Sequence, residues 1–151
     1  MSAARETAIN DANVQEFFKR ADDQIKKGEI DIALYALLKI HDYSEDVLKT
    51  VKFFKSQYEK IVSDSSASQA EREDIFLKLK RMEQLTKKYT AIIEASAYDI
   101  GYGYAKKGDG EKSRKYLLEV LETTPFSTKQ DSLWIKSKKT LLWLYNLEGE
   151  F

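Results

Sequence analysis

Apolar residues recur at three- and four-residue spacing in most segments of the chain between residues 14 and 146. This spacing places side chains on one face of an α-helix. One Pro and six Gly in 151 residues leave few interruptions, and the helix-favouring residues Lys, Glu, Leu and Ala are common. The pattern therefore predicts an all-α protein of about seven helices.

Residues 97–125 predict two short helices joined at Lys107-Gly108-Asp109, with Pro125 marking the exit. Gly101 and Ser113 are small enough to let two helix backbones approach closely, and Leu117 fills the seam between them. The predicted faces are Ala97, Ile100, Gly101 and Tyr104 on the first helix, and Ser113, Leu117, Val120 and Leu121 on the second.

A weaker copy of this pattern lies at about residues 14–43. Lysines followed by Gly28 end its first helix, which Asn13 and Glu16 are expected to cap. Its second helix, about residues 30–41, is apolar nearly all round and is expected to be the most buried helix of the N-terminal half. Aligning the two turns pairs Ala21 with Gly101, Ala33 with Ser113, Leu37 with Leu117 and Ile40 with Val120.

Two longer stripes, Val47–Val62 and Ile75–Ile93, predict a central helical hairpin with a loop at residues 64–68. Ser44-Glu45-Asp46 has the form of a helix start. One helix over residues 70–107 and a break near residues 87–90 both stay open. The seam of this hairpin forms either a core within the chain or a coiled coil between chains.

After Pro125, Ser127 or Thr128 is expected to cap a last helix that reaches about Asn146. The second half of this helix is apolar on every side. It is therefore covered by the same chain, by a second copy, by a partner or by a missing C-terminal region. The residues expected at such an oligomer contact are Trp143, Leu144 and Tyr145.

The segment at about residues 95–125 resembles one unit of the tetratricopeptide repeat family, and that at about residues 14–43 resembles a weaker unit. The residues that match the family's order and spacing are Ile100-Gly101, Tyr104, Gly108-Asp109, Leu117 and Pro125. The resemblance implies a right-handed stack of helical hairpins that binds another protein or peptide in a groove. The groove residues implied by the resemblance are Tyr98, Tyr102 and Lys106 in the better unit, and Phe18, Asp22 and Lys26 in the weaker one.

Some members of the family hold a partner's terminal carboxylate with Lys, Asn and Arg. Tyr98, Tyr102 and Asp99 stand at the groove positions of this chain, so that binding mode is not expected here. Tyr side chains are suited to recognition because they offer a large area and a hydroxyl at low entropic cost. The alternative is that Tyr98 and Tyr102 pack against the long middle helices as core residues.

The charge balance and the residue composition argue against nucleic-acid binding and against the common catalytic and metal sites. Lys+Arg and Asp+Glu are both 25, whereas nucleic-acid binders normally have a basic excess. The chain has no Cys, and His41 is its single His, expected at a helix end or on the surface; neither a zinc site rich in His nor a Cys–His nucleophile can form. Gly101-Tyr102-Gly103 lacks the third glycine of a phosphate loop. No catalytic, cofactor-binding or metal-binding residue is expected.

The chain is expected to be one domain over residues 1–151, with residues 1–11 as a frayed lead-in. No apolar run is long enough to cross a bilayer, and the first residues lack a signal-peptide core. A cytoplasmic location is the default, and export with a signal already removed stays open. The sequence thus favours a non-enzymatic scaffold or adaptor; the alternative is a structural subunit that self-assembles through its C-terminal helix.

Overall fold

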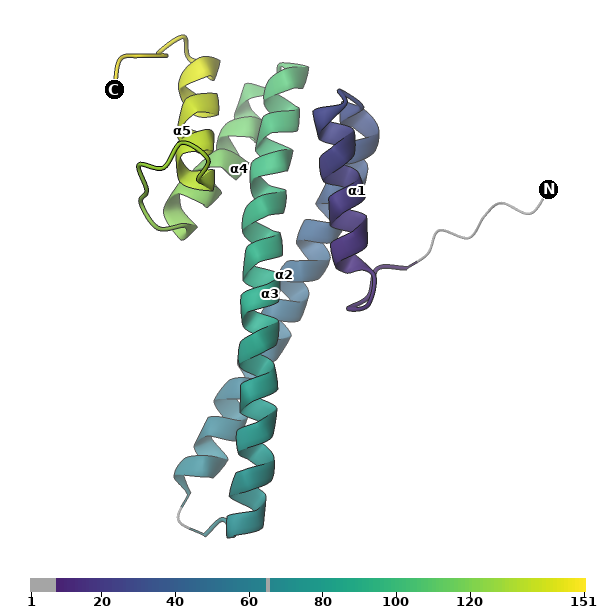
Figure 1. The fold of residues 1–151 in the computed structure, drawn as a ribbon, viewed down its shortest axis with the longest axis vertical. Coiled ribbons are helices and arrows are strands. Elements are labelled where there is room, and N and C mark those ends of the chain that lie inside the picture. The colour runs from purple at the N-terminus through teal and green to yellow at the C-terminus, as the bar shows by residue number, and fades with distance from the viewer. Residues whose placement is uncertain (1–7, 65) are drawn as a thin grey trace, which may run out of the picture. The chain divides into compact units, whose positions relative to one another are not determined.

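Five α-helices form the regular structure of residues 8–64 and 66–151, the part of the chain that the computed structural model describes (Figure 1). The all-α prediction is therefore confirmed for these residues. In chain order the helices are α1 Val14–Lys26, α2 Ile30–Ser63, α3 Gln69–Lys107, α4 Gly110–Thr123 and α5 Leu133–Leu144.

The prediction of about seven helices is wrong because α2 and α3 each run through an expected boundary. α2 continues through Ser44, which is fully buried inside the helix and does not cap a new one. α3 is a single helix through residues 87–90, so the one-helix alternative holds. No Gly or Pro interrupts either stretch, and nothing in the local sequence ends the helix there.

The described residues divide into two compact units. The bundle unit comprises residues 8–41 and Glu94–Phe151, which contain α1, the start of α2, the end of α3, α4 and α5. The hairpin unit is Asp42–Ile93, the remaining parts of α2 and α3. One domain over residues 1–151 stays a prediction, and residues 1–7 of the expected lead-in lie outside the described residues.

The end of α3 is held by two close helix contacts inside the bundle unit. A Cβ added at Gly101 would lie 2.8 Å from Leu117 Cδ2 of α4, and one at Gly103 would lie 2.8 Å from Leu34 Cδ2 of α2. The Ser113 hydroxyl donates a hydrogen bond to the Gly101 carbonyl oxygen at 2.6 Å. The predicted approach of Gly101 and Ser113 is confirmed. The contact at Gly103 goes beyond the prediction.

The two helical hairpins of the bundle unit bury corresponding positions, as the internal alignment predicts. Gly28 and Gly108 end their helices with φ of +82° and +81°, a left-handed conformation that favours glycine. The paired positions are all buried: Ala21, Ala33, Leu37 and Ile40 in the first hairpin, and Gly101, Ser113, Leu117 and Val120 in the second.

Two predicted caps of the bundle unit are wrong. Asn13 does not cap α1 through its side chain; its amide nitrogen donates to the Ala8 carbonyl oxygen, and its Oδ1 accepts from Asn10 N. Ser132, not Ser127 or Thr128, caps α5, because its hydroxyl oxygen accepts a hydrogen bond from Ile135 N. Ser127, Thr128 and Ser132 all carry a hydroxyl that could cap this helix, and local spacing alone does not distinguish them.

The start of α2 is less buried than its composition predicts. Ile32 is 61% exposed and Tyr35 is 58% exposed, although both lie in the stretch that is apolar nearly all round. The buried residues of this stretch are Ala33, Leu34, Leu37, Ile40 and His41. One side of this stretch is therefore exposed, although it still has more buried residues than α1, whose buried residues are Val14, Ala21 and Ile25.

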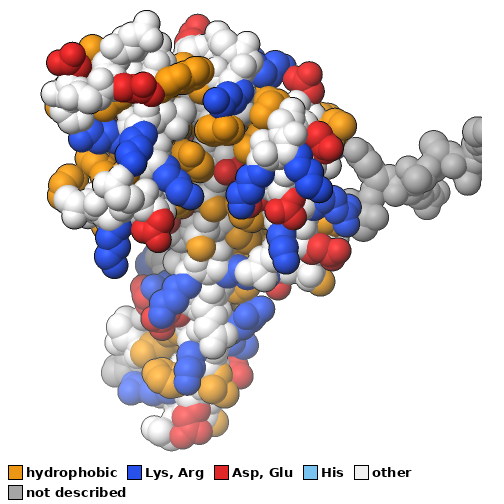
Figure 2. Space-filling view, turned by 45° about the horizontal axis from the view of Figure 1, so that its top comes forward, with side chains coloured by type: hydrophobic (Ala, Val, Ile, Leu, Met, Phe, Trp, Pro, Cys, Tyr) orange, Lys and Arg blue, Asp and Glu red, His pale blue; other side chains and the backbone are white. Residues whose placement is uncertain are grey.

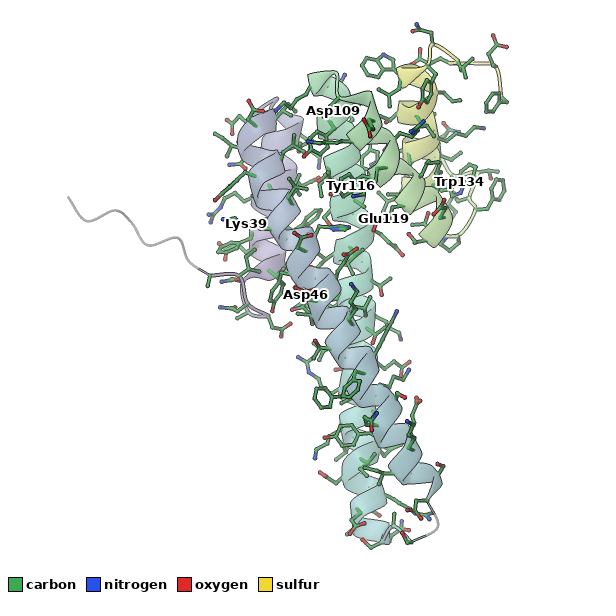
Figure 3. The ribbon with its side chains drawn as sticks, turned by 180° about the vertical axis from the view of Figure 1, so that it is seen from behind. Lys39, Asp46, Asp109, Tyr116, Glu119 and Trp134 are labelled. Atoms are coloured by element: carbon green, nitrogen blue, oxygen red, sulfur yellow. The ribbon has the colours of Figure 1, made fainter. Side chains whose placement is uncertain are left out.

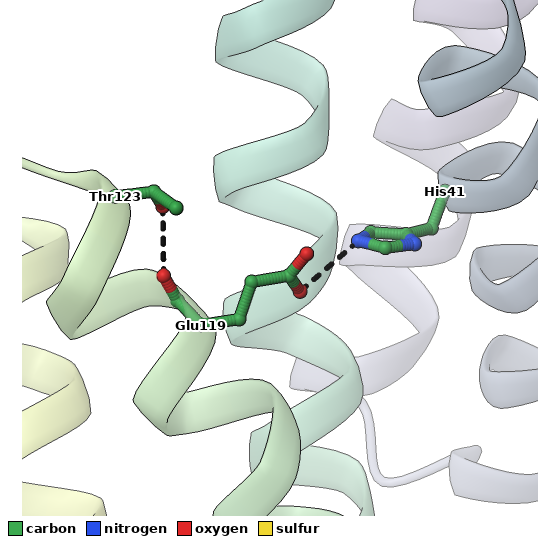
Figure 4. Close-up of polar contacts among 3 residues, drawn as sticks. All are labelled: His41, Glu119 and Thr123. Atoms are coloured by element: carbon green, nitrogen blue, oxygen red, sulfur yellow. Dashed lines mark hydrogen bonds and ion pairs between the residues drawn. The ribbon is translucent and has the colours of Figure 1, made fainter.

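His41 of α2 contacts α4 inside the bundle unit (Figure 4); the α4 residues Tyr116 and Glu119 are labelled in Figure 3. Its Nε2 lies 3.2 Å from Glu119 Oε2, and its ring meets the edge of Tyr116 at 5.7 Å. Tyr116 in turn stacks on Tyr104 of α3, with ring centroids 6.2 Å apart. Thr123 donates to the Glu119 backbone carbonyl oxygen at 2.7 Å. His41 is buried, so its interpretation as a surface or helix-end residue is wrong.

In the hairpin unit, α2 and α3 pack along a shared seam. The ring centroids of Tyr43 and Tyr89 lie 6.0 Å apart, and Lys78 Nζ lies 5.6 Å from the Tyr58 ring centre. These contacts show that the seam forms a core within the chain. Phe53 and Phe76 nevertheless remain 58% and 66% exposed. Within the described part of the chain, no helix combines the length and hydrophobicity needed to cross a membrane, α2 and α3 included.

Gly101→Ala is expected to lower the free energy of unfolding by about 1–2 kcal/mol, because the new methyl group meets the buried Leu117 side chain. This cost outweighs the gain of about 1 kcal/mol in helix propensity that Ala brings. Gly110→Ala is the matched control: nothing lies within 4 Å of its Cβ position. Urea unfolding measures both, and a Gly101→Ala protein as stable as the control would contradict the packing at this contact.

Candidate functional site

The strongest candidate site is a face of the bundle unit formed by α1, α3 and α5, which lie next to one another in Figure 1. Tyr98, Tyr102 and Lys106 follow at four-residue spacing on α3 and so share one stripe of that helix. The ring centroids of Tyr98 and Tyr102 lie 6.2 Å apart. The Tyr98 hydroxyl is hydrogen-bonded to the Thr140 side chain of α5.

Lysine side chains lie on the aromatic rings of this face. Lys106 Nζ is 5.3 Å from the Tyr102 ring centre and 5.0 Å from the Trp143 ring centre of α5. Lys136 Nζ, also from α5, is 5.8 Å from the Tyr98 ring centre. An ammonium group over an aromatic face is attracted by the ring quadrupole. We call these five residues the lysine–tyrosine strip. Figure 2 shows Lys and Arg side chains gathered around hydrophobic ones on this side.

A shallow hollow of about 200 Å³ lies at one end of the strip. Its size suits a side chain or two, not a folded element. The hollow is lined by Tyr102, Ala105, Lys106, Lys139, Thr140, Trp143 and Glu148.

An acidic pair joins α1 to α3 beside the strip. Asp22 Oδ2 lies 2.8 Å from Lys26 Nζ, and the Asp22 side chain is hydrogen-bonded to Asp99. Asp99 is only 5% exposed, and its Oδ2 has no hydrogen-bond partner among the described residues. Two carboxyl groups form a hydrogen bond only when one of them carries a proton, because an ionised carboxylate is an acceptor alone.

Burial decides which member of the pair holds that proton. It raises the pKa of Asp99 to about 8, with further upward contributions from the hydrogen bond and charge of Asp22 and opposition from Lys26 and Lys136. Burial also acts to raise the pKa of Asp22, but hydrogen bonds with Asp99 and Lys26 outweigh it and hold that pKa below its usual value. Near neutral pH, Asp99 therefore donates to an ionised Asp22, and Lys26 balances the remaining charge.

The structure brings most of the sequence-predicted residues together. Tyr98, Tyr102 and Lys106 form the strip with α5, and Asp22 and Lys26 lie in the acidic cluster next to Tyr98. Phe18 is half-buried on α1, one turn before Asp22. The proposed oligomer residues separate: Trp143 lies in the strip at 44% exposed, Leu144 is half-buried, and Tyr145 is 49% exposed beyond α5.

Sequence reasoning missed Lys136 and Thr140 of α5 and the bond between Asp99 and Asp22. Lys136, Thr140 and Trp143 follow at four- and three-residue spacing, the signal of a common helix face. That signal was usable only if the last helix was expected to lie beside α1 and α3 on the same face of the bundle unit. The acidic pair had no signal in the sequence, since 77 positions separate its two members (99 − 22).

A second hollow lies away from the lysine–tyrosine strip, between α1 and the start of α2. It has a volume of about 600 Å³ and apolar walls that include the exposed Ile32 and Tyr35. Its charged side chains are already engaged: Lys39 donates to the Tyr35 hydroxyl at 2.8 Å, and Arg20 lies 3.6 Å from Glu16. We call it the outer hollow. It is lined by Ala8, Ile9, Phe17, Arg20, Ala21, Gln24, Ile32, Tyr35, Ala36, Lys39 and Ile40.

Comparison with known proteins adds no relative: no family model, no curated protein and no solved structure matches the chain. The tetratricopeptide resemblance therefore rests on the residues of the chain itself.

Asp99→Asn is expected to flatten the pH dependence of stability. Asp99 keeps its proton up to a pH near 8 when folded, whereas an ordinary aspartate loses it near pH 3.8. Folding thus takes up a proton between these values, and the contribution of Asp99 to stability falls as pH rises through this window. The asparagine still donates to Asp22, and the variant should be more stable than the wild type at pH 8 by on the order of 1–3 kcal/mol.

Urea unfolding at pH 5, 7 and 8.5 measures this effect, and Asp23→Asn is the matched control. Asp23 is the exposed neighbour of Asp22 on α1. Equal pH slopes for the wild type and Asp99→Asn would contradict a buried, protonated Asp99.

Proposed function

We propose that this chain is a non-enzymatic protein-interaction module with a tetratricopeptide-like architecture. Its bundle unit holds a partner polypeptide in the groove of α1, α3 and α5. The observation that carries the proposal is the lysine–tyrosine strip, in which aromatic rings from α3 and α5 meet on one accessible face.

The chemistry of the strip suits recognition of a polypeptide. Tyr and Trp side chains supply large contact area with few rotatable bonds, and they dominate the energetics of many interfaces. Thr140 fixes Tyr98, and Lys106 lies between Tyr102 and Trp143. Side chains held in place before binding lose less conformational entropy when a partner arrives, which favours affinity.

The packing of the bundle unit supports the architecture. α1 with the start of α2, and the end of α3 with α4, form two hairpins with the same small and apolar residues at the contact positions. In such a stack the first helix of each hairpin lines one face. α1 and α3 are the first helices of the two hairpins, and α5 follows them as the third helix of that face. The grouping of residues predicted from the resemblance is the further support.

A random-peptide display selection on the whole chain tests the proposal. We expect it to yield peptides whose affinity falls at least tenfold in Tyr102→Ala, because the half-buried ring provides contact area on α3. The circular dichroism spectrum and unfolding temperature of this variant should stay close to the wild type. Tyr35→Ala, which removes an exposed tyrosine of the outer hollow, is the control and should bind normally.

A selection that yields no peptide, or peptides that bind Tyr102→Ala as tightly as the wild type, contradicts the proposal. If Tyr102→Ala loses its fold, the ring is a core residue, and Lys106→Glu then provides the test because Lys106 is exposed.

A second candidate function is self-assembly through the C-terminal residues. The observations that favour it are the exposure of Tyr145, at 49%, and of Phe151, at 74%; Phe151 also lines a hollow of about 420 Å³ next to α5. Large exposed apolar side chains mark interaction surfaces when they cluster. Sedimentation equilibrium decides: a concentration-dependent dimer that Phe151→Ser abolishes supports this candidate, and a monomer at several hundred micromolar removes it.

A further inference from the structure

The part of α3 in the hairpin unit, which lies beside α2 in Figure 1, carries large apolar side chains that its seam with α2 leaves exposed. Phe76 and Leu77 are each 66% exposed, whereas their neighbour Ile75 is only 7% exposed. Phe76 lines two hollows, one of about 350 Å³ together with Leu77 and one of about 290 Å³. Large apolar side chains that gather on an exposed face mark an interaction surface.

The exposed residues around these two side chains form one stripe of α3. They follow one another at three- and four-residue spacing, which places them on a common helix face. We call them the α3 stripe, and all of them are exposed and belong to the hairpin unit. In chain order the stripe is Gln69, Glu73, Phe76, Leu77, Lys80 and Gln84.

The order of residues in the α3 stripe is complementary to its own reverse. In two antiparallel copies related by a two-fold axis between Phe76 and Leu77, these two side chains face each other across the axis. Glu73 of each copy then lies level with Lys80 of the other. With a rise of about 1.5 Å per residue, Glu73 and Lys80 each lie about 5 Å along the helix from the axis. Gln69 and Gln84 face each other at the ends.

A parallel arrangement of the same two helices lacks this complementarity. In register it would place Glu73 level with Glu73 of the second copy, and Lys80 level with Lys80. Like charges across a helix pair disfavour that arrangement, and opposite charges select the partner and its orientation. The charge order of the α3 stripe therefore favours the antiparallel pair.

The charged groups on the acidic side of the α3 stripe leave Glu73 able to make this contact. Glu73 accepts one hydrogen bond from the side chain of Gln69, at 3.2 Å, and its second carboxylate oxygen remains as an acceptor. The adjacent Asp74 lies 3.0 Å from Lys78. Arg72 donates to a backbone carbonyl oxygen of the loop before α3, at 3.3 Å.

The groups on the basic side are also accounted for. Lys80 forms no ion pair with any residue that the structure describes. Glu59 and Glu83 line the same hollow of about 290 Å³ as Lys80, but each has a lysine of its own. Glu59 lies 3.9 Å from Lys55, and Glu83 lies 3.7 Å from Lys87.

We propose that the α3 stripe is the contact between two copies of this chain, paired antiparallel about a two-fold axis between Phe76 and Leu77. A two-fold contact requires a surface that is complementary to itself, and this is the commonest symmetry of soluble homo-oligomers. Burial of the apolar side chains supplies the affinity. The exposed pairs of Glu73 with Lys80 set the orientation, because such pairs add little affinity. The inference goes beyond the proposed function, whose groove lies in the bundle unit.

Sedimentation equilibrium of the whole chain tests the contact. We expect a dimer with a dissociation constant on the order of 100 μM, because the interface consists of few side chains. Phe76→Gln together with Leu77→Gln should raise this constant at least tenfold. Phe53→Gln is the matched control, since Phe53 is a phenylalanine of the same unit, 58% exposed, but belongs to α2; it should dimerise as the wild type does. A chain that stays monomeric at about 1 mM overturns the inference.

Exchange of the two charges tests the orientation. Glu73→Lys alone and Lys80→Glu alone should each weaken the dimer at least tenfold, because like charges then meet on both sides of the axis. An equimolar mixture of these two variants should dimerise as the wild type does, since every facing pair again joins a lysine to a glutamate. Glu122→Lys, an exposed position of α4, is the matched control and should leave the dimer unchanged. Single variants that dimerise normally, or a mixture that stays monomeric, overturn the antiparallel pairing.

Phe151→Ser separates this contact from self-assembly through the C-terminal residues. A dimer that persists in Phe151→Ser and is lost in the variant with glutamine at both apolar positions supports the α3 stripe. A dimer that shows the opposite dependence overturns it. Neither result alters the proposed function, because peptide binding that depends on Tyr102 is measured on the bundle unit.

Discussion

The bundle unit depends on how closely α3 approaches its neighbours at two glycines. Leu117 occupies the space where a side chain at Gly101 would stand, and Leu34 does the same at Gly103. Because these contacts lie on different sides of one helix, α3 is fixed between the α1–α2 hairpin on one side and α4 on the other. The stripe with Tyr98 and Tyr102 then has a single orientation, toward α1 and α5. Without that approach, neither the strip nor the acidic pair would form.

The polar groups inside the bundle unit follow the same helix contacts. Ser113 satisfies the Gly101 carbonyl oxygen, and His41 meets Glu119 between α2 and α4. Asp99 and Ser137 are exceptions, because one side-chain oxygen of each is buried without a hydrogen-bond partner among the described residues, and Asp99 also retains its proton near neutral pH. A buried polar group of this kind costs stability unless it is satisfied, and it is often found at functional sites. The position of Asp99 beside Tyr98 places it next to the face that we propose as the binding surface.

Much of the bundle unit was predictable because its signals are local. Glycine at the turns, small residues at Gly101 and Ser113, and the apolar stripe through Leu117 each follow from spacing over a few residues. The number of helices was not predictable in this way. α2 and α3 continue where the sequence provides no helix breaker, and a favourable cap residue such as Ser44 does not by itself end a helix. The exposure of Ile32 and the bond between Asp22 and Asp99 depend on which elements meet in space, and one helix read alone carries no information about that.

The central claim is that the face of α1, α3 and α5 holds a polypeptide. The most direct measurement is an amide chemical-shift map of the labelled chain as a display-selected peptide is added. The account predicts that the largest changes lie at Tyr98, Tyr102 and Lys106 on α3 and around Trp143 on α5. Changes confined to the hairpin unit or to the outer hollow, with these residues unaffected, would contradict it.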